Sequence, residues 1–287
     1  MMSRFARVCG IVLPMLAVLT MAAQDPAPEP AGKYRLACGG KVGDRFTVKT
    51  SVLLDIDIAL ADITKKKSPS SSRFVRSEEF EVEILEAEAA ALKVHCLRST
   101  VEADLSTEVK TSLDGQTFVL RKGENGFRPE GEIPNVNKKD LGFVENLGFF
   151  RQFLPTDEAS PKDQWKVKPT GLLAVLCGGV KGDAQDELTC SFTGVEGGIA
   201  EIALAYNSKS NHGEKSTSET KLNGSFRFDI ARGMPVSFNL AGSVNTAGTL
   251  LRKEEGTGKV DEVGSLVIDS KKLEFSVEFA PVAEEGK

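Results

Sequence analysis

The sequence predicts a mainly β protein: one large, curled antiparallel sheet, shaped like half a barrel, made of two duplicated β lobes with one or two short helices between them. The first supporting observation is the alternation of residues 44–60, where the apolar side chains Phe46, Val48, Val52, Leu54, Ile56, Ile58 and Leu60 all fall on even positions. Such alternation indicates a strand with one buried face and one exposed face. At about 3.3 Å per residue this strand reaches roughly 50 Å, a length that suits a wide and strongly twisted sheet.

The second observation is an internal repeat. An offset of 108 residues aligns Phe80, Val82, Ile84, Leu92, Val94 and Cys96 with Leu188, Cys190, Phe192, Ala200, Ile202 and Leu204 without a gap. An offset of 119 aligns residues 44–49 with residues 163–168, and both segments open with Asp, an aromatic residue two positions later, then Val and Lys. Alternating strands often match by chance, but this shared opening favours a duplication.

The third observation is a change of period between the lobes. Asn137 can cap a helix over residues 138–152, with Asp140 at the capping-box position, and a second short helix is expected over residues 170–176. These helices are apolar and must cover another surface, and the concave face of the sheet is the expected partner.

The N-terminus predicts export. Residues 1–22 resemble a secretory signal peptide, with Arg4 and Arg7 before an apolar stretch and small residues before a cleavage site after Ala22. The apolar stretch is shorter than the about 20 residues that a spanning helix needs, so we expect cleavage and no transmembrane segment afterwards; an uncleaved anchor is the alternative. The expected location is periplasmic or extracellular.

The expected organisation of the rest of the chain follows from these boundaries. Residues 23–33 form a Pro-rich linker, residues 34–133 the first β lobe, residues 134–185 the helical connector, residues 186–282 the second β lobe and residues 283–287 a tail.

The remaining strands follow from the same alternation. In the first lobe, residues 79–84 and 92–96 form a predicted hairpin, and residues 106–113 pair with residues 118–122 through the Asp114-Gly115 turn. The Lys- and Ser-rich residues 65–73 are expected to form an exposed loop tip. In the second lobe, strands are expected at residues 188–192, 200–204, 225–230 and 236–240, with two more from residue 260 onward.

Charge and motifs exclude several classes of function. Without residues 1–22 the chain has 34 basic and 41 acidic residues, a net charge of −7 that argues against binding to nucleic acid and against adsorption to anionic lipid headgroups. The sequence has no G-x-S-x-G, P-loop, H-E-x-x-H or C-x-x-C motif. His95 falls on the exposed face of its strand and His212 in a loop. Asp55 and Asp57 share a strand face but lack a glycine-bearing loop with further oxygen ligands. We therefore expect no enzyme, no metal and no cofactor.

Four cysteines remain after signal cleavage, and an even number in an exported chain permits two disulfides. The pairs that we expect are Cys177–Cys190 and Cys38–Cys96. Free buried thiols are the alternative, because Cys96 and Cys190 fall on apolar strand faces.

The candidate ligand-binding residues are aromatic and aliphatic: Phe143, Leu147, Phe149, Phe150, Phe153 and Trp165. The first five belong to the connector, which either plugs the core of the sheet or acts as a movable plug over an apolar cavity. Trp165 and Phe46 are either a ligand-stacking pair or separate anchors in the cores of their lobes.

Three features together resemble a family of exported bacterial proteins of unknown function. They are the signal peptide, the LP-x(9)-W segment from Leu154-Pro155 to Trp165, and the strand pair GSFRFDIARGMPVSFNLAGS. In that family G-D-x-W follows the Leu-Pro; here Lys162 replaces the glycine, whereas Gly43-Asp44-Arg45-Phe46 keeps it. The architecture is also distantly similar to the half-barrel of periplasmic lipoprotein carriers, which implies a hydrophobic ligand.

These observations predict a non-catalytic exported envelope protein that binds a lipid, acyl chain or apolar peptide in the concavity of its sheet. The alternative is a structural or protein-interaction module of the cell envelope without a small-molecule ligand.

Overall fold

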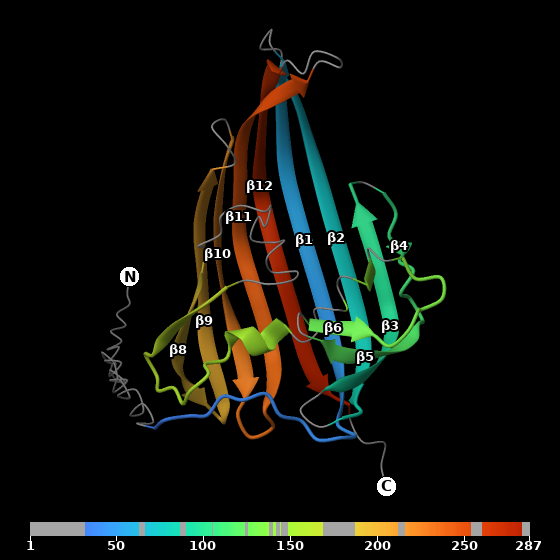
Figure 1. The fold of residues 1–287 in the computed structure, drawn as a ribbon, viewed down its shortest axis with the longest axis vertical. Helices are drawn as coiled ribbons and strands as arrows, with labels where there is room; N and C mark the ends of the chain where they lie inside the picture. Colours follow the sequence, from blue (N-terminus) through green and yellow to red (C-terminus); the bar gives the residue numbers. More distant parts are fainter. Residues whose placement is uncertain are drawn as a thin grey trace, which may run out of the picture.

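A single antiparallel sheet organises the computed structural model, which describes residues 32–62, 67–86, 90–104, 106–123, 126–137, 140–141, 144, 149–168, 187–211, 216–253 and 260–282. The sheet has twelve strands in the order β6-β5-β3-β2-β1-β12-β11-β10-β9-β8-β7, with β4 paired to β3 beside this path. It curls into an open half-barrel (Figure 1). The predicted mainly β architecture is confirmed.

The strands of the first half of the chain are β1 (Arg45–Asp62), β2 (Lys67–Ile84), β3 (Ala91–Ala103), β4 (Val109–Lys110), β5 (Thr117–Gly123) and β6 (Gly126–Pro129). Those of the second half are β7 (Gln164–Val167), β8 (Leu188–Glu196), β9 (Ile199–Asn211), β10 (Ser216–Asp229), β11 (Met234–Lys253) and β12 (Val260–Pro281). A short 3-10 helix, η2 (Phe149–Phe153), lies between the two halves.

The chain enters the sheet at its centre, leaves it at one edge and returns from the other edge. The strands β1 to β6 run outward in order, and β7 to β12 run inward until β12 pairs with β1. The connection from β6 to β7 therefore has to cross the sheet. Figure 1 shows η2 on this connection, in front of the lower parts of β10 to β12. The N-terminal residues 32–44 run along the same lower end, where Tyr34 and Ala159 exchange backbone hydrogen bonds of 2.8 and 2.9 Å.

Even-numbered side chains in the first part of β1 face the core, as the alternation predicts, but Leu60 near the end of the strand is 41% exposed. Val48 and Val52 expose 1% and 5% of their surface, and Phe46 is half-buried. A β-bulge at Asp55/Ile56 shifts the register between β1 and β12 by one residue. Leu54 therefore pairs with an odd-numbered residue, Leu273, whereas Ile56 pairs with an even-numbered one, Ser270. On both sides of the bulge, residues 53–59 are half-buried on both faces of the strand.

The predicted loop tip at residues 65–73 is wrong over the part that the structure describes. Residues 67–73 belong to β2, which pairs with β1 from Ala61↔Lys67 to Arg45↔Glu83. Ser and Pro are weak strand formers, but the long β1 offers a complete ladder to pair with, and this tertiary pairing outweighs local propensity.

Two other predicted elements differ from the structure. Of residues 106–113 only β4 is a strand, and it pairs with β3 rather than with β5. The strand β7 lies inside the range predicted for the helical connector. Of the predicted helix over residues 138–152, residues 140, 141 and 144 are helical and residues 149–153 form η2. The predicted helix over residues 170–176 lies outside the described residues.

The predicted duplication is compatible with the strand order. The aligned strands β2 and β3 are neighbours in the first half, as β8 and β9 are in the second. The hairpins differ in register, since Ile84 faces Leu92 whereas Phe192 faces Ile202. The duplication and the two-lobe division stay predictions.

Candidate functional site

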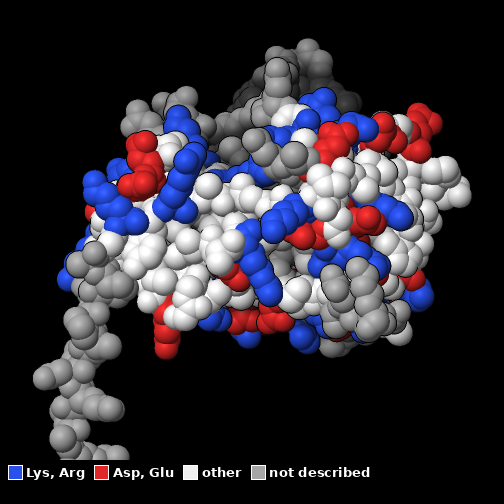
Figure 2. Space-filling view, turned by 90° about the horizontal axis from the view of Figure 1, so that it is seen from below, with Lys and Arg blue, Asp and Glu red and all other residues white. Residues whose placement is uncertain are grey.

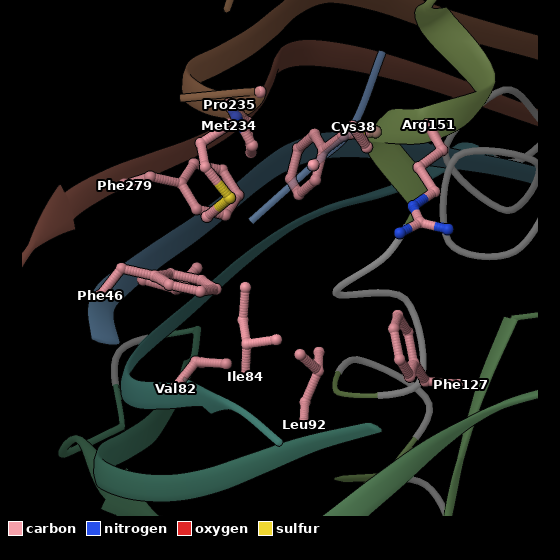
Figure 3. A pocket seen from close by; sticks show the side chains of 14 residues that line it. Cys38, Phe46, Val82, Ile84, Leu92, Phe127, Arg151, Met234, Pro235 and Phe279 are labelled. Carbon is pink, nitrogen blue, oxygen red and sulfur yellow. The ribbon is translucent and has the colours of Figure 1, made fainter. Parts of the chain in front are cut away.

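An apolar pocket lies at the lower end of the sheet, where β1 begins and β12 ends. Figure 2 views the molecule from this end and shows charged side chains of both signs, Lys and Arg as well as Asp and Glu, interspersed with uncharged surface. The pocket has a free volume of about 60 Å³. It is lined by Cys38, Gly39, Phe46, Val48, Val82, Ile84, Leu92, Phe127, Phe150, Arg151, Gly233, Met234, Pro235 and Phe279 (Figure 3).

The floor of the pocket follows directly from strand alternation. Phe46 pairs with Val82, and Val48 pairs with Phe279, so these side chains on three adjacent strands point to the same face of the sheet. The rings of Phe46 and Phe279 lie 6.1 Å apart between centroids. This floor is continuous because the first and last strands of the chain are neighbours in the sheet.

One wall is made where the N-terminal segment meets the turn between β10 and β11. The N–H of Gly39 donates a 2.8 Å hydrogen bond to the carbonyl oxygen of Gly233. Gly233 has φ +64°, and a Cβ on it would lie 2.7 Å from the nitrogen of Gly39. Both the left-handed backbone and the close approach require glycine here. This contact brings Cys38 and Met234 to the pocket.

The roof is Phe150 of η2. It exposes only 3% of its surface, and its ring centroid lies 4.8 Å from that of Phe279, 5.9 Å from Phe238 and 6.0 Å from Phe226. Contacts of this geometry are favourable beyond the area that they bury. Phe150 therefore packs into the aromatic core with part of its ring and lines the pocket with another part.

The other predicted site residues have different positions. Phe153 is completely buried, packs 5.2 Å from the ring of Phe238 and does not line the pocket. Phe149 opens η2, but its side chain lies outside what the structure describes, and so do Phe143 and Leu147.

Trp165 lies on the edge strand β7 and does not line the pocket, whereas Phe46 on β1 does. Five strands separate β7 from β1, so the two residues do not form the ligand-stacking pair that the sequence left open. The indole N–H of Trp165 donates a 3.1 Å hydrogen bond to the carbonyl oxygen of Phe153. Trp165 thus fits the alternative of a packing anchor.

Positive charge lies beside the pocket at Cys38. Burial raises the pKa of the Cys38 thiol, while the Arg151 guanidinium and, more weakly, the Lys122 ammonium act in the opposite direction. Arg151 extends from η2, and Lys122 extends from β5. Lys122 pairs across strands with Phe127, which lines the pocket, so the two side chains stand on the same face of the sheet.

The predicted disulfides do not agree with the structure. Cys38, Cys96 and Cys190 are free thiols, which contradicts the Cys38–Cys96 pair and leaves Cys190 without a bond to Cys177, itself outside the described residues. For the Cys38–Cys96 pair the physical reason is placement: Cys96 is fully buried on β3, whereas Cys38 is half-buried at the pocket.

A buried ionic cluster was missed from the sequence. Arg76 and Glu78 of β2 have side chains only 7% and 1% exposed and lie 2.7 Å apart, and Arg76 also contacts Asp140 at 3.1 Å. Burial raises the pKa of Glu78 in spite of Arg76. Burial also acts to raise the pKa of Asp140, but hydrogen bonds from Ser112 and the charge of Arg76 outweigh it and lower that pKa. The cluster fastens the chain after β6 to the face of the sheet.

Its sequence signal was available. Arg76 and Glu78 occupy even positions between Phe74 and Phe80, so the parity that buries the phenylalanines also buries them.

The remaining polar candidates form no site. His95 is bonded to the Thr117 hydroxyl at 2.8 Å, and Asp57 pairs with Lys271 at 2.9 Å and accepts from the Ser71 hydroxyl. Within the described part of the chain, no group of His, Cys, Asp and Glu side chains is arranged to hold a metal ion. His212 lies outside that part.

No protein-family model and no curated protein matches the chain. Among solved structures it is similar to a lipovitellin structure titled for lipid–protein interactions, with a TM-score of 0.44 and 11% identity over 85% of this chain and 26% of that chain. It is also similar to the InvG secretin domain β-barrel of the Salmonella SPI-1 injectisome (TM-score 0.17, 7% identity, 85% of this chain and 65% of that chain). A third likeness is to Pseudomonas aeruginosa OpdQ (TM-score 0.18, 7% identity, 83% and 98%).

This chain spans about a quarter of the lipovitellin chain that it matches. At these scores and identities no function is transferred from any of the three proteins. Of the helices in the described residues, none has the length and apolar character to span a membrane.

Proposed function

We propose that this protein is a non-catalytic exported protein that binds a hydrophobic ligand in the pocket beneath Phe150. The observation that carries the proposal is the pocket's construction. Side chains from both halves of the chain, from Phe46 and Val48 on one side to Met234 and Phe279 on the other, leave apolar space between them. Well-packed interiors contain few voids larger than a water molecule, so an apolar space of this size supports a binding role.

The volume limits what the pocket holds. About 60 Å³ exceeds the roughly 10–15 Å³ that one water needs. It is far below the about 300–1,000 Å³ of pockets that enclose a whole drug-sized ligand. The pocket therefore suits the end of an alkyl or acyl chain, with the rest of the ligand outside it.

The proposal places the protein in the periplasm or outside the cell. Its support is the signal-like composition of residues 1–22 and the Pro-rich segment that follows. Detection of the mature N-terminus in a secreted or periplasmic fraction tests this part separately.

Titration calorimetry with octanol, a neutral chain, tests the binding itself. We expect octanol to bind the unaltered protein and to bind Met234→Trp at least about tenfold more weakly, because an indole at this half-buried position fills the pocket. The matched control is Leu97→Trp, since Leu97 is 46% exposed and lies at a β-bulge away from the pocket.

A second measurement does not depend on any variant. Bound octanol should slow the reaction of Cys38 with a maleimide, because Cys38 lines the pocket. Absence of octanol binding, or binding without protection of Cys38, contradicts the proposal.

A further inference from the structure

Two cations reach the pocket from different elements. Arg151 lines it directly, next in sequence to the roof residue Phe150, and Lys122 of β5 stands opposite the lining residue Phe127 of β6. In Figure 3 the Arg151 guanidinium lies near Cys38 and Phe127, on the far side of the labelled group from Phe46 and Phe279. The pocket thus has an aromatic end and a cationic end.

Consecutive side chains of a strand point to opposite faces, so the carboxylates that pair with Arg121 do not face Lys122. Glu86 and Glu130 both pair with Arg121, at 2.6 and 3.1 Å. Within the described residues no carboxylate lies within ion-pair distance of Lys122. An anion that enters between Arg151 and Lys122 therefore meets positive charge and does not have to displace these carboxylates.

Because the protein has a negative net charge, an anion can bind only where positively charged side chains lie close to it. The whole chain carries a formal charge of −5, so it repels anions at long range. Binding of an anionic group then depends on close, charge-assisted hydrogen bonds, which a guanidinium makes with carboxylate or phosphate oxygens in a fork geometry.

We propose that the ligand is a single-chain amphiphile with an anionic head group, an inference that rests on the proposed function. The chain end occupies the space between Phe46, Val48 and Phe150, and the head group is held by Arg151 and Lys122. Carboxylate and phosphate heads share this chemistry.

The test compares octanol, octanoate and octyl phosphate by titration calorimetry at neutral pH and low salt. The unaltered protein should bind one or both anions at least about tenfold more tightly than octanol, and added salt should weaken only the anions. Within the preferred head-group series, affinity should increase about fourfold per added methylene until the pocket is filled, and then level off.

Variants identify the groups that hold the head. Arg151→Gln should weaken anion binding about tenfold and octanol binding much less, and Lys122→Gln should weaken anion binding severalfold. The matched control is Arg128→Gln, which removes one exposed positive charge from β6, a neighbour of β5, without touching the pocket.

The outcomes separate the two proposals. Equal affinity for octanol and both anions overturns the anionic head group and leaves the hydrophobic pocket standing. Anion binding that Arg128→Gln weakens as much as Arg151→Gln and Lys122→Gln also overturns the assignment. Failure of all three compounds to bind overturns the proposed function itself. Preference for octanoate over octyl phosphate, or the reverse, decides between a fatty acid and a phosphorylated chain as the source of the charge.

Discussion

Replacing Phe150 by alanine tests whether this roof residue is firmly packed against the core or can move away from the pocket. Deleting the ring removes about 100 Å³ of side chain, and at about 24 cal/mol per Å³ the cavity alone costs about 2 kcal/mol. The lost free energy of transferring the ring from water to the core adds to this cost, so a typical buried Phe→Ala substitution destabilises the fold by about 3–5 kcal/mol in total. Phe150 already borders open space, so fewer contacts are lost, and we expect about 3 kcal/mol.

The matched comparison is Phe153→Ala on the same short helix. Phe153 is completely buried, does not line the pocket and packs 5.2 Å from Phe238 and 5.9 Å from Phe226. Its truncation should cost about 4–5 kcal/mol, near the upper end of the range for buried phenylalanine.

Equilibrium unfolding in urea measures both costs. The fluorescence of Trp165, the single tryptophan, reports on this region because its indole N–H is bonded to the backbone of Phe153. Octanol should stabilise Phe150→Ala more than the unaltered protein, since the ligand fills the enlarged space.

A loss below about 1 kcal/mol for Phe150→Ala would refute this reasoning, because a residue packed against three aromatic rings cannot be removed so cheaply. Such a result would favour the movable plug that the sequence left open.

Three further predictions concern charge, backbone and thiols. The pKa of Asp140 is lowered in the folded state, so its contribution to stability is present above its unfolded value of 3.8 and is lost as pH falls through the lower folded pKa; acid titration of unfolding should show the unaltered protein losing its advantage over Asp140→Asn in that range. Gly242→Ala places a Cβ 1.9 Å from the carbonyl oxygen of Lys221, so it should cost more than about 2 kcal/mol and lower the thermal midpoint, and a neutral result would mean that β10 and β11 are further apart. Burial raises the pKa of Cys96 and Cys190 to about 12, so mass spectrometry should find them unmodified by maleimide until the protein is unfolded, while Cys38 reacts in the native state at a rate that rises with pH.

The sequence predicted the sheet because the sheet depends on a periodic signal. The alternation of β1 identified a long strand with one buried face, and Val48 and Val52 are buried as that alternation requires. Residues 67–73 were misassigned because their composition favours a turn, whereas their structure is decided by the neighbouring strand. The composition of residues 67–73 does not reveal that β1, the strand with which they pair, is long enough to reach them.

The pocket was beyond the reach of the sequence for a related reason. Its wall depends on Gly39 meeting Gly233, two glycines in segments that share no motif. Phe150 was identified as a candidate site residue from its aromatic neighbours in the sequence. Arg151 beside it was not, because a single cation can be recognised as a site residue only when the cavity next to it is known. By contrast, Arg76 and Glu78 needed no coordinates: their parity alone placed them in the core.

Because β1 pairs with β12, the central part of the sheet cannot form until the last strand of the chain is available. The two strands match from Phe46↔Pro281 to Asp62↔Gly264, so each partner lies about 200 residues away along the chain. Until β12 arrives, β1 has one row of backbone donors and acceptors open, and contacts of such separation are slow to form. A chain that is synthesised from its N-terminus therefore keeps that edge open until its last strand is made, and the pocket floor is finished last.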